Sequence, residues 1–128
     1  MAHFAKINSD NIVEDIIVVS NDVITVDDVE NEDLGIEFCK TIHGEDTNWV
    51  QCSYNSNFRH TYPMKGSEWK PDIDKFILPQ PFPSWTLDSE YNWQPPIPYP
   101  EETNDKKYVW IDDLYQNNNT LGWVEHID

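Results

Sequence analysis

The chain has 128 residues, of which 38% are hydrophobic and 13% aromatic, and its formal net charge is −16 at pH 7. This length predicts one domain, or one small domain with an arm, and the negative charge repels phosphate backbones, which argues against a nucleic-acid partner. No apolar run reaches the roughly 20 residues that span a bilayer, and Met1 to Phe4 do not begin a charged-then-apolar secretory signal. We therefore expect a soluble protein with no membrane partner.

The charge is unevenly distributed along the chain. Half of the 24 acidic residues precede Trp49, whereas residues 49–79 hold Arg59, Lys65, Lys70 and Lys75 against three acids. A strong acidic balance most often means a solvated surface. The alternatives are a preference for a basic partner surface and an adaptation to salty surroundings.

The first elements in chain order predict a β-hairpin. Ala5–Ile7, within Phe4–Ile7, alternates between apolar and polar residues, Ser9–Asn11 has turn composition, and Ile12–Val19 is rich in β-branched residues. Within the second strand, Ile16–Val19 is a continuous apolar run, which indicates a strand covered on both faces. Val23–Val26 is expected to extend the same sheet.

A short helix is predicted next, from Leu34 to Ile42. Asn31 begins a group of capping residues before it, and Gly44 can end it. Leu34, Phe38 and Ile42 recur at positions i, i+4 and i+8, so we expect these three side chains to form the buried face of the helix.

A second hairpin is predicted from the alternation of Trp49–Tyr54, the turn residues Asn55–Asn57 and a returning strand at Phe58–Tyr62. Pro63 closes it, because proline cannot continue a central ladder. Residues 1–62 are therefore expected to form a compact α+β unit of two hairpins and one helix.

Residues 63–128 form a different kind of segment, in which an aromatic residue, a polar turn and another aromatic recur. The pattern covers Trp69–Phe76, Trp85–Trp93 and Trp110–Trp123, and eight of the nine prolines lie from Pro71 to Pro100. We expect an arm of Trp/Pro-rich hairpins on extended connectors. The predicted fold class is mostly β with one short helix, a form of α+β.

Two interpretations of the arm remain open. Aromatic pairs commonly stabilise a small sheet from within, but isolated hairpins are marginal in water, and aromatic patches with a polar rim are typical of binding surfaces. If the arm binds a partner, we expect a particular set of residues to make the contact. These are Trp69, Trp85, Trp93, Pro95, Pro96, Pro98 and Tyr99.

The sequence offers little for catalysis, and we predict no catalytic residue, no cofactor and no metal site. The four histidines are scattered without HExxH spacing. The acidic stretch Asp27–Asp33 lacks the glycine that an EF-hand loop needs at its sixth position. Cys39 and Cys52 have no CxxC spacing, and we expect both to be reduced thiols.

Several strings along the chain carry a resemblance to a known family. They are Ile16–Asn21, Gly35–Cys39, Trp49–Asn55, Asn57–Arg59, Pro81–Asp88, Trp93–Pro96, Tyr108–Trp110 and Trp123–Glu125. These strings are similar to a family of small proteins of marine bacteriophages, especially phages that infect cyanobacteria. The likeness keeps the order of its segments over nearly the whole chain, and it departs from the family at His60–Ser67, where a glycine-rich turn is usual.

The resemblance implies a structural protein located in the virion, which assembles in the host cytoplasm. We expect a capsid decoration, or cement, protein whose partner is the major capsid protein or another virion protein, and an oligomer is compatible with that role. The alternatives are a tail, neck or fibre-associated adaptor and, from another class, a small host-modulating enzyme. The resemblance transfers no catalytic residues, so we expect a protein that is not an enzyme.

Overall fold

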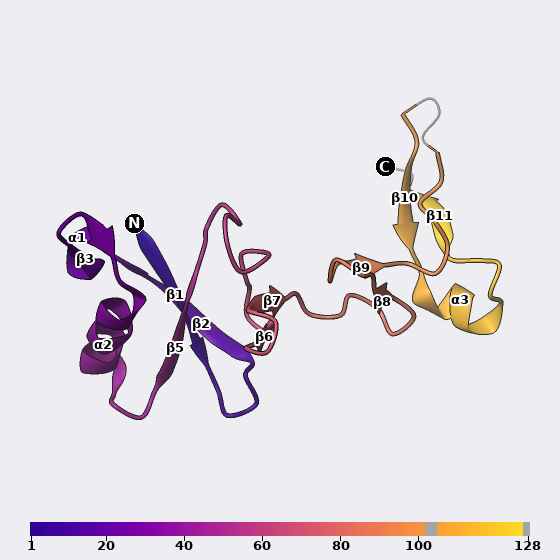
Figure 1. The fold of residues 1–128 in the computed structure, drawn as a ribbon. Helices are drawn as coiled ribbons and strands as arrows, with labels where there is room; N and C mark the ends of the chain where they lie inside the picture. Colours follow the sequence, from indigo (N-terminus) through magenta and orange to yellow (C-terminus); the bar gives the residue numbers. More distant parts are fainter. Residues whose placement is uncertain (102–104, 127–128) are drawn as a thin grey trace. The chain divides into compact units, whose positions relative to one another are not determined.

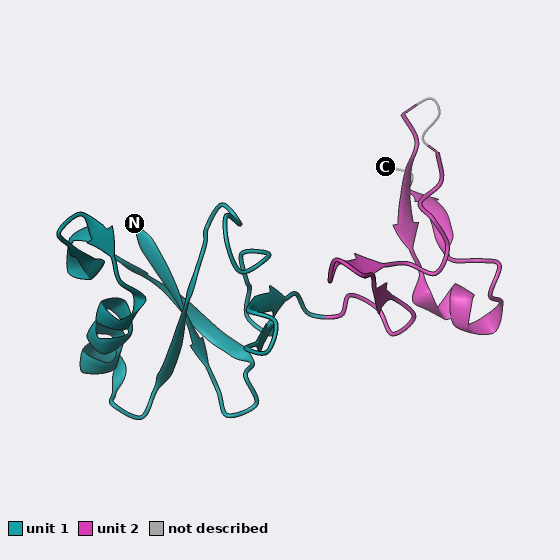
Figure 2. Ribbon diagram, in the orientation of Figure 1, with its two compact units in different colours: residues 1–79 teal, residues 80–128 magenta. Residues whose placement is uncertain are grey.

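The computed structural model describes residues 1–101 and 105–126, which form two compact units, residues 1–79 and residues 80–128 (Figures 1 and 2). The described chain is mostly β with three helices, which confirms the predicted fold class. The division falls after Pro79, whereas we expected it after Tyr62. The difference arises because the first aromatic hairpin packs into the core of the first unit.

The first unit is built on a three-stranded antiparallel sheet in the order β2-β1-β5, formed by β1 (Ala2–Ile7), β2 (Val13–Val19) and β5 (Asn48–Cys52). The pairing of β1 with β2 confirms the first predicted hairpin. In the central strand, Phe4 and Ala5 are both fully buried. Because successive side chains point to opposite faces of a strand, the sheet has a core on each side.

The two cores are covered by different elements. Helix α2 (Glu32–His43) lies on one side of the sheet, and the hairpin of β6 (Glu68–Lys70) and β7 (Lys75–Ile77) lies on the other (Figure 1). Trp69 pairs with Phe76 across this hairpin, as the sequence predicts. The helix-side core contains Ala2, Phe4, Val19, Ile24, Cys39 and Trp49, and the hairpin-side core contains Ala5, Ile7, Val13, Val50, Cys52, Trp69 and Phe76.

The prediction that Ile16–Val19 is covered on both faces is wrong. β2 is an edge strand of the sheet, Ile16 and Ile17 are half-buried and Val18 is exposed. The apolar run therefore reflects β propensity in this strand rather than burial.

The extension of the sheet by Val23–Val26 is also not found. Asn21–Ile24 forms a single helical turn, α1, and the next two residues, β3 (Thr25–Val26), pair with β4 (Val29–Glu30) in a separate ribbon. The turn places Ile24 in the helix-side core, where its side chain is fully buried.

The predicted helix and both of its ends are confirmed. The side chain of Asn31 accepts a hydrogen bond from the backbone N–H of Asp33 at 2.9 Å, which satisfies a donor at the helix start. Gly44, at φ 124°, ends the helix and donates its N–H to the carbonyl of Lys40 at 2.8 Å. Few side chains tolerate this backbone conformation, so glycine suits the position.

The buried face of α2 differs from the predicted stripe. Gly35 and Cys39 are buried, whereas Ile42 at the end of the stripe is 58% exposed. The cause is a close approach: a Cβ atom on Gly35 would overlap the ring of Phe4. Because the ring needs that space, the helix places Gly35 against Phe4, while Ile36 and Phe38 pack on the same core only in part.

The second predicted hairpin is wrong. Trp49–Tyr54 does begin with a strand, but β5 pairs with β1, and Phe58–Tyr62 forms no strand. Arg59 and His60 adopt positive φ values of 56° and 75°, a left-handed conformation that a strand does not allow.

The second unit contains two small hairpins. In the first, Leu87 rather than Trp85 faces Trp93, and in the second Trp110 faces Trp123, with a short helix inside its connection. The elements are β8 (Thr86–Leu87), β9 (Trp93–Gln94), β10 (Lys107–Trp110), α3 (Asp112–Asn117) and β11 (Trp123–His126).

Both cysteines are free and buried, Cys39 in the helix-side core and Cys52 in the hairpin-side core. Burial raises the pKa of Cys39 to about 11 and that of Cys52 to about 12. We expect the native protein to resist alkylation at pH 8 and the denatured protein to accept two labels without reductant, because only an accessible thiolate reacts quickly. Intact-mass measurement checks this; a native protein labelled within minutes, or a denatured one that takes no label, would contradict it.

Candidate binding surface of the second unit

Three tryptophans form the centre of the second unit. Trp110 is 6% exposed, and its ring meets the ring of Trp123 at 5.2 Å and that of Trp85 at 6.1 Å, both edge to face. Gly122 allows this packing, because a Cβ atom there would overlap the ring of Trp110. We call Trp85, Trp110 and Trp123 the tryptophan cluster. The aromatic residues of this cluster therefore pack against one another, which is the first of the two interpretations of the arm.

Asp112 ties the tryptophan cluster to its surroundings. Its carboxylate accepts hydrogen bonds from the Ser84 hydroxyl, from Trp110 Nε1 at 3.0 Å and from Gln116 Nε2 at 3.1 Å. The bond from Ser84, followed by the bond from Trp110, lowers the pKa of Asp112. The charged carboxylate is thus the form that the folded unit prefers.

We expect acid to weaken the second unit through this carboxylate. A lowered folded-state pKa contributes stability above the ordinary carboxyl pKa of about 3.9, and that contribution is lost as the pH falls through the folded-state value. Asp112→Asn should therefore lower the unfolding midpoint at pH 7 and reduce its further decline between pH 5 and pH 3. Thermal unfolding followed by the near-ultraviolet circular dichroism of the tryptophans gives the midpoint at each pH. Asp113→Asn is the matched control at an exposed neighbour; parallel declines in Asp112→Asn and the parent would contradict the assignment.

The segment Trp93–Tyr99, which we call the proline ridge, is anchored to the tryptophan cluster. Trp123 Nε1 donates a hydrogen bond to the carbonyl of Ile97 at 2.8 Å. The ring of Tyr99 packs edge to face on Trp123 at 4.9 Å, and its hydroxyl accepts the backbone N–H of Tyr108 at 3.0 Å. The ridge is therefore anchored by the side chain of Trp123 and by the backbone of Tyr108, which lie at least nine residues from their partners in the sequence.

The outer side of the proline ridge remains open. Pro96 and Pro98 are exposed, Tyr99 is 46% exposed, and Trp93 and Pro95 are half-buried. No charged residue occurs from Tyr91 to Pro100, in a chain whose net charge is −16. The ridge is thus an uncharged, pre-extended surface on an acidic protein.

The other two predicted contact residues lie elsewhere. Trp69 is 8% exposed and packs on Phe76 at 4.8 Å in the first unit, with the guanidinium of Arg59 5.1 Å from its ring centroid. Trp85 belongs to the tryptophan cluster, and its Nε1 is buried without a hydrogen-bond partner in the described part of the chain. Sequence reasoning did not identify Asp112 or Trp123 as anchors, although the repeated tryptophan spacing pointed to Trp123.

Within residues 1–101 and 105–126, no three His, Cys, Asp or Glu side chains are grouped so that they could hold a metal ion. In the same residues, every helix is too short or too polar to cross a bilayer. Comparison of the chain with protein-family models, curated proteins and solved structures finds no significant match.

Proposed function

We propose that the chain is a structural protein of a bacteriophage virion, and that it decorates the assembled head by binding the major capsid protein non-covalently. The observation that carries the proposal is the proline ridge, Trp93–Tyr99, which is exposed, uncharged and anchored. The ordered resemblance to phage proteins along the chain supports the same role.

The ridge is suited to binding for two physical reasons. Prolines and the bond from Trp123 hold it extended before a partner arrives, so little conformational entropy is lost on docking. Tyrosine and tryptophan are the side chains that most often dominate interface energies. The acidic remainder of the chain keeps unattached copies apart by charge repulsion.

A charge placed on the ridge should break the contact and leave the fold intact. We expect Pro96→Glu combined with Pro98→Glu to weaken binding to particles that lack the native copy about tenfold or more, which corresponds to about 1.4 kcal/mol. Pro71→Glu, at an exposed proline of the first unit, is the matched control. Sedimentation of labelled protein with particles gives the affinity. Equal retention of the ridge variant and the control would place the contact elsewhere.

The abundance of the protein in purified particles tests the location. Because a capsid shell repeats its subunits by symmetry, head decoration requires hundreds of copies per particle. A few to tens of copies would indicate a tail, neck or fibre-associated adaptor instead. Absence from particles would overturn the virion role altogether.

A further inference from the structure

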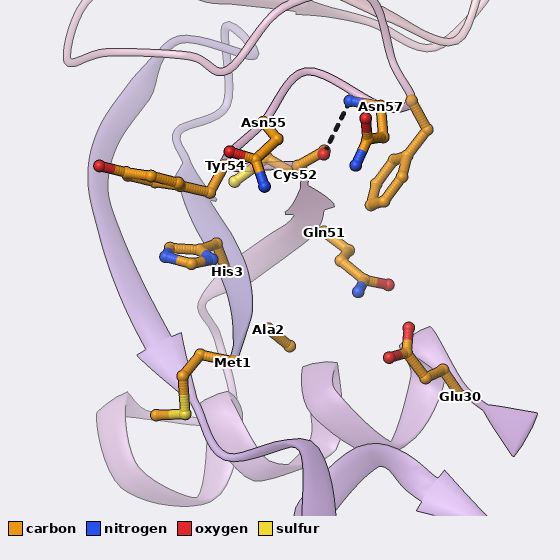
Figure 3. Close-up of a pocket in the computed structure, with 11 residues that line it drawn as sticks. Met1, Ala2, His3, Glu30, Gln51, Cys52, Tyr54, Asn55 and Asn57 are labelled. Atoms are coloured by element: carbon orange, nitrogen blue, oxygen red, sulfur yellow. Dashed lines mark hydrogen bonds between the residues drawn. The ribbon is translucent and has the colours of Figure 1, made fainter. Parts of the chain in front are cut away.

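The first unit contains a cavity of about 160 Å³ at the place where β1 begins and β5 ends. Figure 3 shows it open between the start of the chain, the turn after β5 and Glu30 of β4. None of the predicted contact residues lines it. Among the lining residues are His3, Glu30, Gln51, Tyr54, Asn55 and Asn57.

Planar polar side chains converge on this cavity. The amides of Gln51, Asn55 and Asn57 and the carboxylate of Glu30 lie around the opening in Figure 3. The turn that carries the two asparagines is held by a hydrogen bond from the backbone N–H of Asn57 to Oγ of the buried Ser53, at 2.8 Å. Each carboxamide offers two N–H donors and one acceptor. The cavity can therefore pair with a ligand that both donates and accepts.

An aromatic stack forms one wall. Tyr54 is 65% exposed, and its ring stacks on His3 at 5.3 Å with an interplanar angle of 23°. Tyr62 packs edge-on against both rings. Burial and, second, the positive N-terminus lower the pKa of His3, so this wall adds no charge at neutral pH. The result is a packed group of three aromatic rings, two of which line the cavity beside a group of amides.

We propose that this cavity binds one neutral pyranose, such as the terminal sugar of a glycan. The ring would lie beside the stacked pair of Tyr54 and His3, while its hydroxyls pair with the amides of Gln51 and Asn57 and with Glu30. Adjacent hydroxyls donate and accept at once, which matches carboxamides. An apolar cavity of about 150 Å³ holds a benzene ring, so the volume here fits one six-membered ring partly enclosed.

Competing ligand classes fit less well. The N-terminal ammonium of Met1, which also lines the cavity, offsets the charge of Glu30, and the net charge of −16 disfavours an anion. A small ammonium ion would suit Glu30 and Tyr54 through charge and cation–π attraction. However, such an ion offers at most one acceptor, the hydroxyl of choline, for the N–H donors of three carboxamides, and unpaired donors at a site reject a ligand that cannot satisfy them.

The test is a titration of the full chain, followed by the backbone amide resonances. The probes are the methyl glycosides of glucose, galactose, mannose and N-acetylglucosamine, with choline as the ammonium probe. We expect at least one glycoside to shift the resonances of His3, Gln51 and Asn55 with a dissociation constant on the order of 1 mM, as a ligand of this size allows. Choline should shift them less.

Two variants keep the proposal falsifiable. Gln51→Leu and Asn57→Ala remove amides from the cavity and should each weaken the binding glycoside about tenfold. Asn48→Ala, an exposed position at the other end of β5, should bind like the parent. The inference fails if no glycoside shifts the cavity resonances, if choline binds more tightly, or if the cavity variants bind as well as Asn48→Ala. The proline ridge belongs to the other unit, so this outcome is independent of the capsid-binding test.

Discussion

Replacement of Trp110 by alanine is expected to unfold the second unit and to leave the first unit folded. The ring contacts Trp85, Trp123 and Tyr115, and its Nε1 donates to Asp112. Truncation of a buried tryptophan costs about 3–5 kcal/mol. A unit of this size has little more stability than that to lose, because small domains bury a smaller fraction of their surface.

Two-dimensional amide NMR separates the outcomes, since each unit has its own resonances. In Trp110→Ala, we expect the signals of residues 80–128 to collapse to the narrow range of an unfolded chain and those of residues 1–79 to keep their positions. Val109→Ala is the matched control, an exposed residue on the same strand. Dispersed signals from the second unit in Trp110→Ala would show that the tryptophan cluster is not its core.

Local signals in the sequence were sufficient for much of the fold. Asn31 and Gly44 mark both ends of α2 through hydrogen bonds to residues at most four positions away. The first hairpin follows from the turn at Ser9–Asn11 between two β-rich stretches. The pairing of Trp110 with Trp123 follows from aromatic residues on either side of a polar segment.

Two of the errors share one physical cause, which is a contact between residues far apart in the sequence. Phe58–Tyr62 looks like a strand, but the side chain of Arg59 is drawn to Glu32, 27 residues earlier. The buried face of α2 is set by Phe4, which fits only against Gly35. Neither preference is visible in the periodicity of the segment itself.

The candidate sites were predictable to different degrees. The prolines and aromatics of the ridge stand out in the sequence, but their exposure depends on Trp123, which reaches Ile97 from β11. The cavity of the first unit could not be predicted, because Glu30 and Gln51 belong to no motif and meet only through the folded chain.

The strongest expected effect in the first unit comes from Arg59→Ala. The guanidinium forms two hydrogen bonds with the carboxylate of Glu32, at 2.6 and 2.9 Å, and a third with the carbonyl of Gln51 at 2.8 Å. Its Nε bonds Asp74 at 3.1 Å, and its carbon lies 5.1 Å from the ring centroid of Trp69. The hydrogen bonds to Glu32 are the first cause of the raised pKa of Arg59, so the cation is present at every ordinary pH.

These bonds also satisfy backbone groups at the outer edge of the sheet. β5 is the last strand on that side of the described sheet, and its Gln51 N–H donates to Glu32 at 2.8 Å while its carbonyl accepts from Arg59. The ion pair thus occupies the place that a further strand would take. Without Arg59, the half-buried Glu32 carboxylate keeps only the N–H of Gln51, and the carbonyl of Gln51 loses its partner.

We expect Arg59→Ala to lower the free energy of unfolding of the first unit by about 2–4 kcal/mol, because removal of one member of a partly buried pair leaves the other unpaired. Arg59→Lys should recover only part of this, since an ammonium cannot form the two parallel bonds. Lys70→Ala is the matched control, because Lys70 also pairs with a carboxylate, that of Glu68, at 3.4 Å. Both of these side chains are exposed, so the free energy of unfolding should fall by about 0.5 kcal/mol or less.

Urea unfolding of the four chains that form a double-mutant cycle between Arg59→Ala and Glu32→Ala measures the coupling directly. A coupling energy of about 1 kcal/mol or more, little affected by salt, is expected for a pair screened from solvent. If Arg59→Ala lowers the free energy of unfolding no more than Lys70→Ala does, the ion pair does not stabilise the outer edge of β5.

Arg59→Ala should also affect the proposed sugar cavity, because Gln51 lines it. We expect this variant to weaken glycoside binding under conditions in which the first unit remains folded. Such a result would link the hydrogen bonds at the edge of β5 to the shape of the cavity.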